Sequence, residues 1–246
     1  MLGLIGGTGL SSIAQLDVER VHALHTPYGE TSTPIEEGSI FGQSIFFLHR
    51  HGGSGKPIPP HLVNYRANIW AMRELGVRRI LAINAVGAIN PRCQSGRLFL
   101  PRQLIDYTWG RKHTFDDGAC GSLMHVDFTQ PFTDSLRQEV LGCDSSCALV
   151  DASETVLGVV QGPRLETAAE IRRFARDGCD LIGMTSMPEA ALAREAGLDY
   201  QPICMVVNSA AGVDGDSIDH ADIKAVLERE TALLVRLLEA YLQTQV

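Results

Sequence analysis

Residues 155–207 decide the fold class, and their sequence is TVLGVVQGPRLETAAEIRRFARDGCDLIGMTSMPEAALAREAGLDYQPICMVV. Apolar runs of strand length alternate here with stretches in which apolar residues recur at helical spacing. We expect strands at 155–160, 180–182 and 202–207, and helices at 167–176 and 189–196. A glycine, Gly178 or Gly197, follows each helix, and glycine is a common helix stop. This strand–helix alternation is typical of an α/β protein.

The rest of the chain continues the alternation. Further strands are expected at 2–5, 44–48 and 79–85, and further helices at 65–75 and 133–141. A long C-terminal helix is the clearest element, because apolar residues from Ile223 to Leu242 fall on one stripe. No repeat, low-complexity stretch or linker marks a boundary, so we expect one α/β domain that spans residues 1–246.

The composition limits the classes of partner. The chain has 246 residues, of which 45% are hydrophobic and 20% charged, as in ordinary soluble globular proteins. A formal net charge of −8 argues against a nucleic-acid partner, which would require a basic face. It is compatible with a small anionic substrate, since a local pair of cations can bind phosphate inside an acidic protein. No basic leader and no apolar run of membrane-spanning length occurs, so we expect a cytoplasmic protein with no membrane partner.

Cysteine and histidine spacing gives no sign of a metal site. The six cysteines form neither a CxxC pair nor a zinc-binding pattern, and we expect them to be free thiols. His49 and His51 alternate across a predicted strand, and no third ligand follows nearby. We therefore expect no metal.

A glycine-rich turn, Gly6-Gly7-Thr8-Gly9, follows the first predicted strand. Backbone N–H groups in such a turn can hold an anion, although a structural turn explains the glycines equally well. A dinucleotide fingerprint would need a third glycine where Ser12 stands and an acidic residue about 20 residues further on. Neither is present, and no Gly-Lys-Ser/Thr follows to make a P-loop.

Polar residues also follow the other predicted strands. Arg50 and His51 end the strand at 44–48, and a guanidinium beside an imidazole is suited to phosphate. Similar strand-to-loop junctions occur at 84–87, 162–167 and 183–189, and Asn208 ends the strand at 202–207. Each is an ordinary junction by itself. In an α/β sheet, however, such strand ends meet at one rim and form a ligand site there.

These motifs occur in an order that resembles one known family, the trimeric purine nucleoside phosphorylases and methylthioadenosine phosphorylases. The resemblance extends over essentially the whole chain. Two motifs, Asn64-Tyr65-Arg66-Ala67-Asn68-Ile69 and Gly162-Pro163-Arg164-Leu165-Glu166-Thr167, are similar to the methylthioadenosine phosphorylase branch. The resemblance implies a single domain with a central mixed β-sheet flanked by helices. It also implies phosphorolysis, in which orthophosphate attacks C1′ of a nucleoside and no cofactor takes part.

The same resemblance assigns roles to residues. Those that would hold phosphate are Thr8, Arg50, His51, Ala85 through its backbone N–H, and Thr185. Those that would contact the nucleoside are Met184 at the ribose and Glu166 and Asn208 at the purine. His51 and Asn208 would serve catalysis directly. The residue types fit, because cations and hydroxyls position a dianion and donors at the base stabilise the departing purine anion.

Asn208 indicates which purine is bound. A 6-aminopurine presents an acceptor at N7 and a donor at position 6, whereas a 6-oxopurine presents two acceptors. A carboxylate suits the first edge, and a carboxamide suits the second once N7 is protonated. Adenine-releasing members of the branch carry acids where this chain has Asn208 and Ala210. We therefore expect a 6-oxopurine nucleoside.

The 5′ end of the nucleoside is the open question. His220 favours a 5′-hydroxyl, whereas the apolar Ile223 one turn later favours a methylthio group. His125 resembles a loop residue that closes the site of a neighbouring subunit, which implies a homotrimer or a hexamer of two trimers. Leu165 stands where relatives commonly have phenylalanine, and Lys56 has no assigned role.

The hypothesis we favour is a phosphorylase of S-methyl-5′-thioinosine. The runner-up is a general purine nucleoside phosphorylase that acts on inosine or guanosine, and an adenine-specific methylthioadenosine phosphorylase ranks third. A nucleoside-binding protein without activity would be expected to lose Arg50, His51 or Thr185, and all three are present. A dinucleotide oxidoreductase is disfavoured by the incomplete glycine fingerprint.

Overall fold

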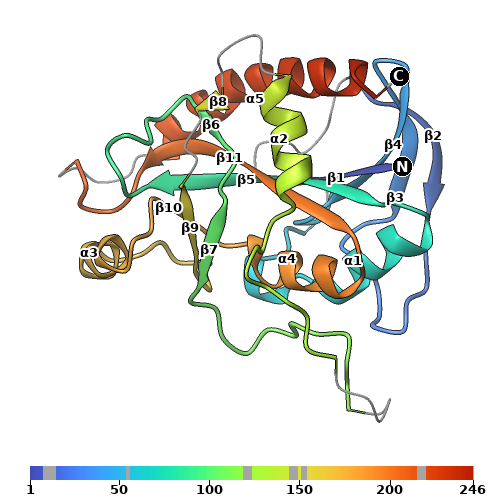
Figure 1. Ribbon diagram of the computed structural model, residues 1–246, viewed down its shortest axis with the longest axis horizontal. Helices are drawn as coiled ribbons and strands as arrows, with labels where there is room; N and C mark the ends of the chain where they lie inside the picture. Colours follow the sequence, from blue (N-terminus) through green and yellow to red (C-terminus); the bar gives the residue numbers. More distant parts are fainter. Residues whose placement is uncertain are drawn as a thin grey trace.

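The computed structural model describes residues 1–7, 15–53, 56–118, 124–143, 149–150, 154–214 and 220–245 (Figure 1). Within these ranges, the side chains of Val150 and of residues 220–225, 227 and 228 are not described. Thr8, which was predicted to bind phosphate, therefore lies outside the described residues. Cys120 and Cys147 do as well, and the four described cysteines are free thiols, as expected.

One mixed sheet of eleven strands forms the centre of the described structure. Its middle consists of four parallel strands: β4 (Gln43–His49), β1 (Leu2–Gly6), β5 (Arg79–Ala88) and β11 (Asp199–Ser209). Antiparallel strands extend one side: β3 (Ile35–Ile40) and β2 (Asp17–His22). The other side continues through β10 (Leu181–Gly183), which is antiparallel to β5, to β9 (Val156–Val159) and β7 (Gln103–Asp106). Two short strands lie beyond β11: β6 (Leu98–Phe99) and β8 (Leu149–Val150).

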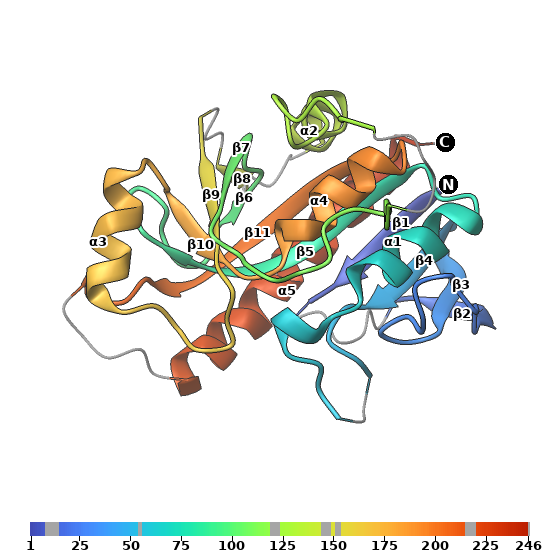
Figure 2. The ribbon, with the colours of Figure 1, turned by 90° about the horizontal axis from the view of Figure 1, so that it is seen from below.

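Helices cover both faces of this sheet (Figures 1 and 2). The first face carries α1 (Tyr65–Glu74), preceded by the short 3-10 helix η1 (Pro60–Leu62), and α4 (Ser186–Glu195). The opposite face carries α5 (His220–Gln243) and α2 (Asp134–Gly142). α3 (Ala168–Arg176) packs near the end of the sheet that consists of β10, β9 and β7.

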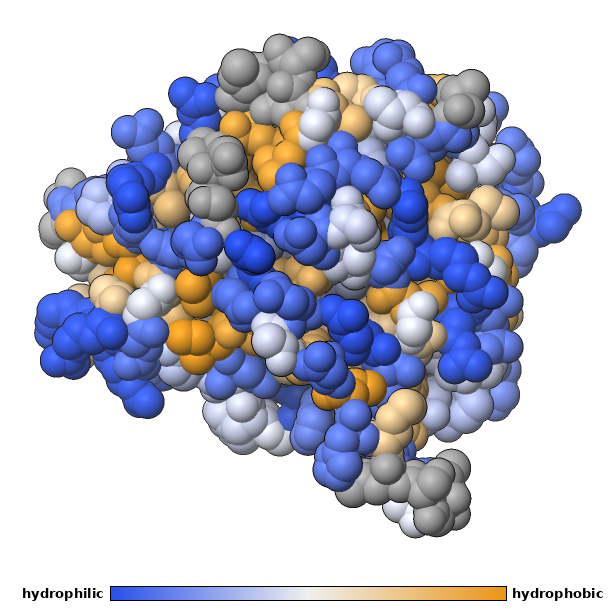
Figure 3. Space-filling model, viewed as in Figure 1, coloured by the Kyte–Doolittle hydropathy of each residue, from blue (hydrophilic) through white to orange (hydrophobic). Residues whose placement is uncertain are grey.

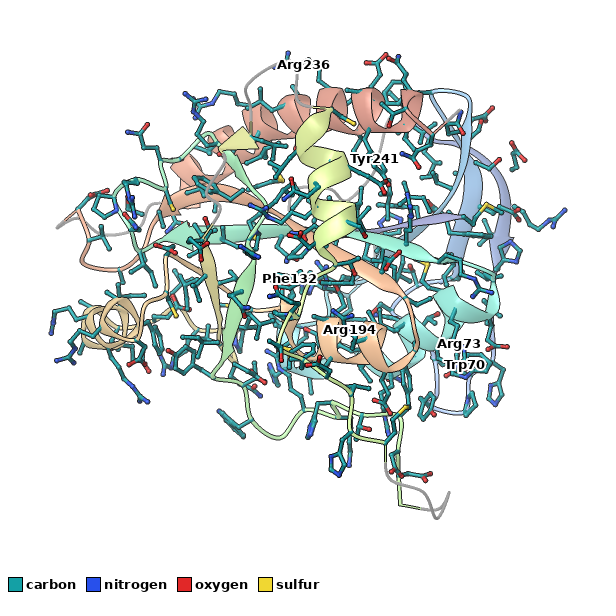
Figure 4. The ribbon with its side chains drawn as sticks, viewed as in Figure 1. Trp70, Arg73, Phe132, Arg194, Arg236 and Tyr241 are labelled. Atoms are coloured by element: carbon teal, nitrogen blue, oxygen red, sulfur yellow. The ribbon has the colours of Figure 1, made fainter. Side chains whose placement is uncertain are left out.

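The sheet separates the hydrophobic core into two clusters, because successive residues of a strand point to opposite faces. Along β5, Ile80 and Ala82 pack with α1 and α4, whereas Leu81 and Ile83 pack with α2 and α5. Figure 4 shows Phe132 and Tyr241, which belong to opposite clusters, on opposite sides of β5 in that view. A strand buried on both faces reads as a continuous apolar run, and this explains the sequence of β5.

The surface in Figure 3 is mainly hydrophilic, with hydrophobic residues in separate patches. No helix of the described residues has both the length and the apolar character that crossing a membrane requires.

The predicted α/β class and every predicted element occur in the structure. Three of these elements are longer than expected: β11 begins at Asp199, β5 continues to Ala88 and α4 begins at Ser186. Five strands were not predicted: β2, β3, β6, β7 and β8. β2 is an exposed edge strand of sequence DVERVH, so it lacks the apolar signal of a buried strand. β6 and β8 are only two residues long.

The topology places the candidate residues together. Because β1, β4, β5 and β11 run parallel, their carboxyl ends reach the same edge of the sheet. Gly7, Arg50 and Asn208 lie at or just beyond three of these ends. β10 brings Met184 to the same place, since its Ile182 pairs with Gly87 near the end of β5.

Candidate active site

A cavity of about 430 Å³ opens at this edge of the sheet. Seven of the residues predicted to form the site line its wall: Arg50, His51, Ala85, Glu166, Met184, Thr185 and Asn208. Other parts of the wall come from Gly7, from the Pro57–Pro60 segment and from Leu165. Residues spread over more than 150 positions of the chain, from Arg50 to Asn208, therefore converge on a single site.

Arg50 is fully buried and held by a carboxylate that was not part of the predicted site. Its Nε and Nη2 donate to the two carboxylate oxygens of Glu189 at 2.8 and 2.7 Å, and its Nη1 donates to the carbonyl of Ile83 at 2.9 Å. Burial by itself would lower the pKa of Arg50, but the charge and hydrogen bonds of Glu189 raise it above its usual value. The guanidinium is therefore cationic and fixed in one orientation.

Glu189 is fixed in turn by Tyr200, whose hydroxyl donates to Oε1 at 2.8 Å. Both side chains are buried, and burial together with the Glu189 carboxylate raises the pKa of Tyr200 well above its usual value. The hydroxyl therefore stays protonated as a donor. The sequence did not single out Glu189, because an acidic residue in the first turn of a helix is common and its partner Arg50 lies 139 positions away.

The glycine turn approaches Arg50 very closely. A Cβ added to Gly7 would lie 2.7 Å from Nη1 of Arg50 and 2.6 Å from the carbonyl oxygen of Ile83. No side chain fits there without displacing either the guanidinium or the backbone of β5. This finding explains the residue type at Gly7 without any nucleotide fingerprint.

His51 is held in one tautomer. Its Nδ1 lies 2.8 Å from the carbonyl oxygen of Ile58, and a carbonyl only accepts, so Nδ1 carries a proton. Burial lowers the pKa of His51, and the neighbouring Arg50 lowers it further. The imidazole is therefore neutral at pH 7, with Nε2 as an acceptor.

A third polar group on this side of the cavity is the hydroxyl of Thr185. It donates to Oδ1 of Asn84 at 3.0 Å, and Nδ2 of Asn84 donates to Ser186 at 2.8 Å. All three side chains are buried. The hydroxyl oxygen of Thr185 is therefore fixed and keeps its lone pairs as acceptors.

Asn208 stands where the pairing of β11 with β5 shifts register. Val206 pairs with Val86 and Asn208 with Gly87, so one extra residue on β11 is accommodated between them. Such an irregularity changes the direction of the side chains that follow it. Nδ2 of Asn208 donates to the carbonyl of Ser209 at 2.7 Å. The carboxamide therefore retains a second N–H and its oxygen for a ligand.

Glu166 lies on the same side of the cavity, in the turn that precedes α3. Burial raises the pKa of its carboxyl above the usual value. Ala210 is buried in an apolar cluster with Ile89 and Ile182, so no second acid is present beside Asn208. This side of the cavity therefore contains one carboxyl group and one carboxamide.

Four predicted residues are not placed in the cavity. His125 is exposed in a separate depression that it shares with Arg194 of α4 (Figure 4 labels Arg194). Thr8 lies outside the described residues, as do the side chains of His220 and Ile223 in the first turns of α5. Lys56 is exposed, and Leu165 is 43% exposed at the edge of the cavity.

Known proteins with similar sequence and structure point to one family. The chain matches the family model described as the phosphorylase superfamily over residues 2–243. It is 46% identical over 238 residues to a probable S-methyl-5′-thioinosine phosphorylase of Xanthomonas campestris pv. campestris, with 96% of this chain and 95% of that protein covered. It is 37% identical over 244 residues to the 6-oxopurine nucleoside phosphorylase of Pyrococcus furiosus, with 97% and 91% covered. The solved structure of methylthioadenosine phosphorylase from Schistosoma mansoni in complex with tubercidin is similar with a TM-score of 0.87 and 29% identity, covering 99% of this chain and 90% of that one.

Proposed function

The chain belongs to the phosphorylase superfamily, and on this premise we propose that it cleaves 6-oxopurine nucleosides with orthophosphate. The favoured substrate is S-methyl-5′-thioinosine, which yields hypoxanthine and 5-methylthioribose 1-phosphate. The observation that carries the proposal is the carboxamide of Asn208 at the wall of the cavity, with no acid at Ala210. Relatives named for thioinosine and 6-oxopurine nucleosides support the same substrate class.

In the proposed reaction, a phosphate oxygen forms a bond to C1′ while the bond from C1′ to N9 breaks. The electron pair of that bond passes into the purine, whose negative charge spreads to N7 and O6. N7 takes up a proton from water, which balances the proton that HPO₄²⁻ releases to solvent when it forms the ester. The remaining N–H of Asn208 donates to O6, and its oxygen accepts from the protonated N7. Both contacts are stronger to the departing purine than to the bound nucleoside, so they lower the barrier.

Orthophosphate acts as the second substrate, and no cofactor is needed. Arg50 and the backbone N–H of Ala85 donate to its oxygens. The hydroxyl of Thr185, which donates to Asn84 in the free protein, would turn to donate to a phosphate oxygen, and Nε2 of His51 faces the P–OH group. Nε2 of neutral His51 accepts the P–OH proton of HPO₄²⁻ in a hydrogen bond. Thr8 would complete this end of the site, and Met184 would contact the ribose.

The proposal includes a homotrimeric, cytoplasmic enzyme with only small-molecule substrates. His125 and the neighbouring Met124, which is 62% exposed, would close the cavity of the next subunit, and His220 and Ile223 would contact the 5′ group. Leu165 at the edge of the cavity offers an apolar contact for such a segment. Sedimentation velocity tests the assembly, since a protein that remains a monomer at micromolar concentration contradicts it.

The function is tested by phosphate-dependent release of base from methylthioinosine, inosine and methylthioadenosine at equal concentration. We expect methylthioinosine to have the highest kcat/KM. Equal or faster cleavage of inosine would mean that the protein is a general purine nucleoside phosphorylase. The 6-oxopurine nucleoside phosphorylase of Pyrococcus furiosus gives a precedent for that outcome. Faster cleavage of methylthioadenosine would overturn the role of Asn208. Arg50→Ala should raise the KM for phosphate, and normal phosphate dependence would remove Arg50 from the phosphate site.

A further inference from the structure

Arg111, in the segment between β7 and α2, is a buried cation next to the cavity that neither the sequence motifs nor the proposed reaction uses. Its side chain is 9% exposed. Nε donates to Oε1 of Gln161 at 3.2 Å, and Nη2 donates to the carbonyls of Val160 and Gln161 at 3.2 and 2.8 Å. Nη1 donates to the carbonyl of Met184 at 2.8 Å and also to the carbonyl of Met187.

These acceptors belong to segments that carry the nucleoside side of the site. Met184 lines the cavity, and the 160–161 segment leads directly into the turn that bears Glu166. The two segments are in close contact, because a Cβ added to Gly162 would lie 2.5 Å from Sδ of Met184. A single guanidinium therefore fixes the distance between the ribose contact and the start of the turn that contacts the purine.

The charge environment of Arg111 also differs from that of an ordinary buried arginine. It forms no ion pair with any carboxylate of the described residues, and its other neighbour is Tyr65, whose hydroxyl lies 3.3 Å from Nη1. Burial lowers the pKa of Arg111. Backbone carbonyls, a side-chain amide and a phenol are thus its only hydrogen-bond partners in the described structure. Buried charges are usually paired, so a set of carbonyls built around one cation points to a role in geometry.

We infer that Arg111 is a positioning residue, which holds Met184 and the 160–166 turn in the geometry required for nucleoside binding and cleavage. This inference rests on the proposed function of those two segments. The planar guanidinium offers five N–H groups in a fixed arrangement, whereas lysine offers a single point charge. A displacement of about 1 Å in a substrate contact can reduce the rate on the order of 100-fold.

The test compares Arg111→Lys and Arg111→Met with Arg137→Lys as a matched control. Arg137 is also buried and donates to a backbone carbonyl, that of Leu100. Leu100 does not line the cavity, whereas Met184, an acceptor of Arg111, does. For Arg111→Lys we expect kcat/KM for the nucleoside to fall at least about tenfold, with the KM for phosphate changed less than about threefold. Arg111→Met should fall further, and Arg137→Lys should leave both constants within about twofold when they are expressed per folded molecule.

An Arg111→Lys variant with unchanged nucleoside constants would overturn the inference. A rise in the KM for phosphate as large as the fall in nucleoside kcat/KM would also overturn it, because the change would then act on the whole cavity and not on Met184 and the 160–166 turn. If Arg111→Met fails to fold, Gln161→Ala replaces it. This change removes the Nε partner of Arg111, together with the acceptor of the Trp109 N–H, and should lower nucleoside kcat/KM about two- to fivefold. If the wild type cleaves no nucleoside, the proposed function fails by itself. Amide hydrogen exchange at residues 160–166 then decides the positioning role, with faster exchange expected in Arg111→Lys and unchanged exchange contradicting it.

Discussion

The two ends of the cavity, which we propose hold phosphate and the purine, are constructed differently. At the phosphate end, Arg50 and Thr185 are buried and already bonded to protein groups, Glu189 and Asn84. At the purine end, Asn208 and Glu166 are only half-buried, and the carboxamide of Asn208 has one bond, to a backbone carbonyl. The phosphate end is therefore rigid before any ligand arrives, whereas the purine end keeps free hydrogen-bonding groups for the ligand.

This difference separates two kinds of function. Phosphate is the same in every reaction of a phosphorylase, so one fixed set of partners can serve all nucleoside substrates. Buried pairs such as Arg50 with Glu189 hold those partners in place. The base varies between relatives, and a half-buried residue at a strand end can change without disturbing the core. Substitutions at the purine end should therefore alter specificity, and substitutions at the phosphate end should alter stability and phosphate use together.

The largest effect is expected for Asn208→Asp. A carboxylate accepts from a 6-amino group but cannot donate to O6, so the ratio of kcat/KM for methylthioinosine over methylthioadenosine should fall on the order of 10³- to 10⁴-fold. Asn208→Ala is the control, because it removes both contacts and should weaken both substrates without reversing the preference. An unchanged ratio in folded Asn208→Asp would contradict the role of Asn208 and the distinction between the two ends.

Glu189→Gln should have the next largest effect. The fully buried Arg50 loses its counter-charge, and breaking such a pair costs about 3–5 kcal/mol in the free energy of unfolding, which urea denaturation measures. Arg50→Met combined with Glu189→Gln should recover part of this loss, because no unpaired charge remains. Glu139→Gln is a matched control at a partly exposed pair with Arg79 and should cost less than about 1 kcal/mol. If Glu189→Gln were as stable as that control, the pair of Arg50 with Glu189 would not stabilise the phosphate end, and the proposed rigidity of that end would be contradicted.

The sequence could place residues at strand ends better than it could reveal the partners that hold them. Arg50, Met184 and Asn208 lie within two residues of the ends of predicted strands, so local pattern places them at strand ends. The pair of Arg50 with Glu189 joins positions 139 residues apart, and Arg111 depends on carbonyls that any residue type could supply. Local sequence carries no trace of such partners. The exposed strand β2 and the partly buried strand β3 escaped prediction because they are not continuously buried and so lack the apolar run that marked the central strands.

A smaller loss is expected for Tyr200→Phe. The change removes one hydrogen bond to the Glu189 carboxylate and should lower the free energy of unfolding by about 1.5–3 kcal/mol. Tyr241→Phe is a matched control, since Tyr241 is equally buried but its hydroxyl lies 3.5 Å from Nη1 of Arg79. That distance is long for a hydrogen bond, so the control should lose less than about 1 kcal/mol. Equal losses in the two variants would mean that Tyr200 contributes by packing alone and does not orient Glu189.

The smallest effects should be opposite pH dependences of stability at the two ends. The pKa of His51 is lowered in the folded protein, so as pH falls below its usual 6.5 the unfolded state binds a proton that the folded state does not, and stability falls. The pKa of Glu166 is raised, so as pH rises above its usual 4.5 the folded state keeps a proton that the unfolded state releases, and stability again falls. His51→Gln should therefore gain stability relative to wild type as pH is lowered below 6.5, and Glu166→Gln should gain as pH is raised above 4.5. Urea denaturation of the three proteins between about pH 4.5 and 8 measures both differences, within the range where such linkage operates. If the stability differences of the two variants from wild type changed in the same direction with pH, burial would not act separately on the two ends. One pH-dependent change of the whole protein would then explain both.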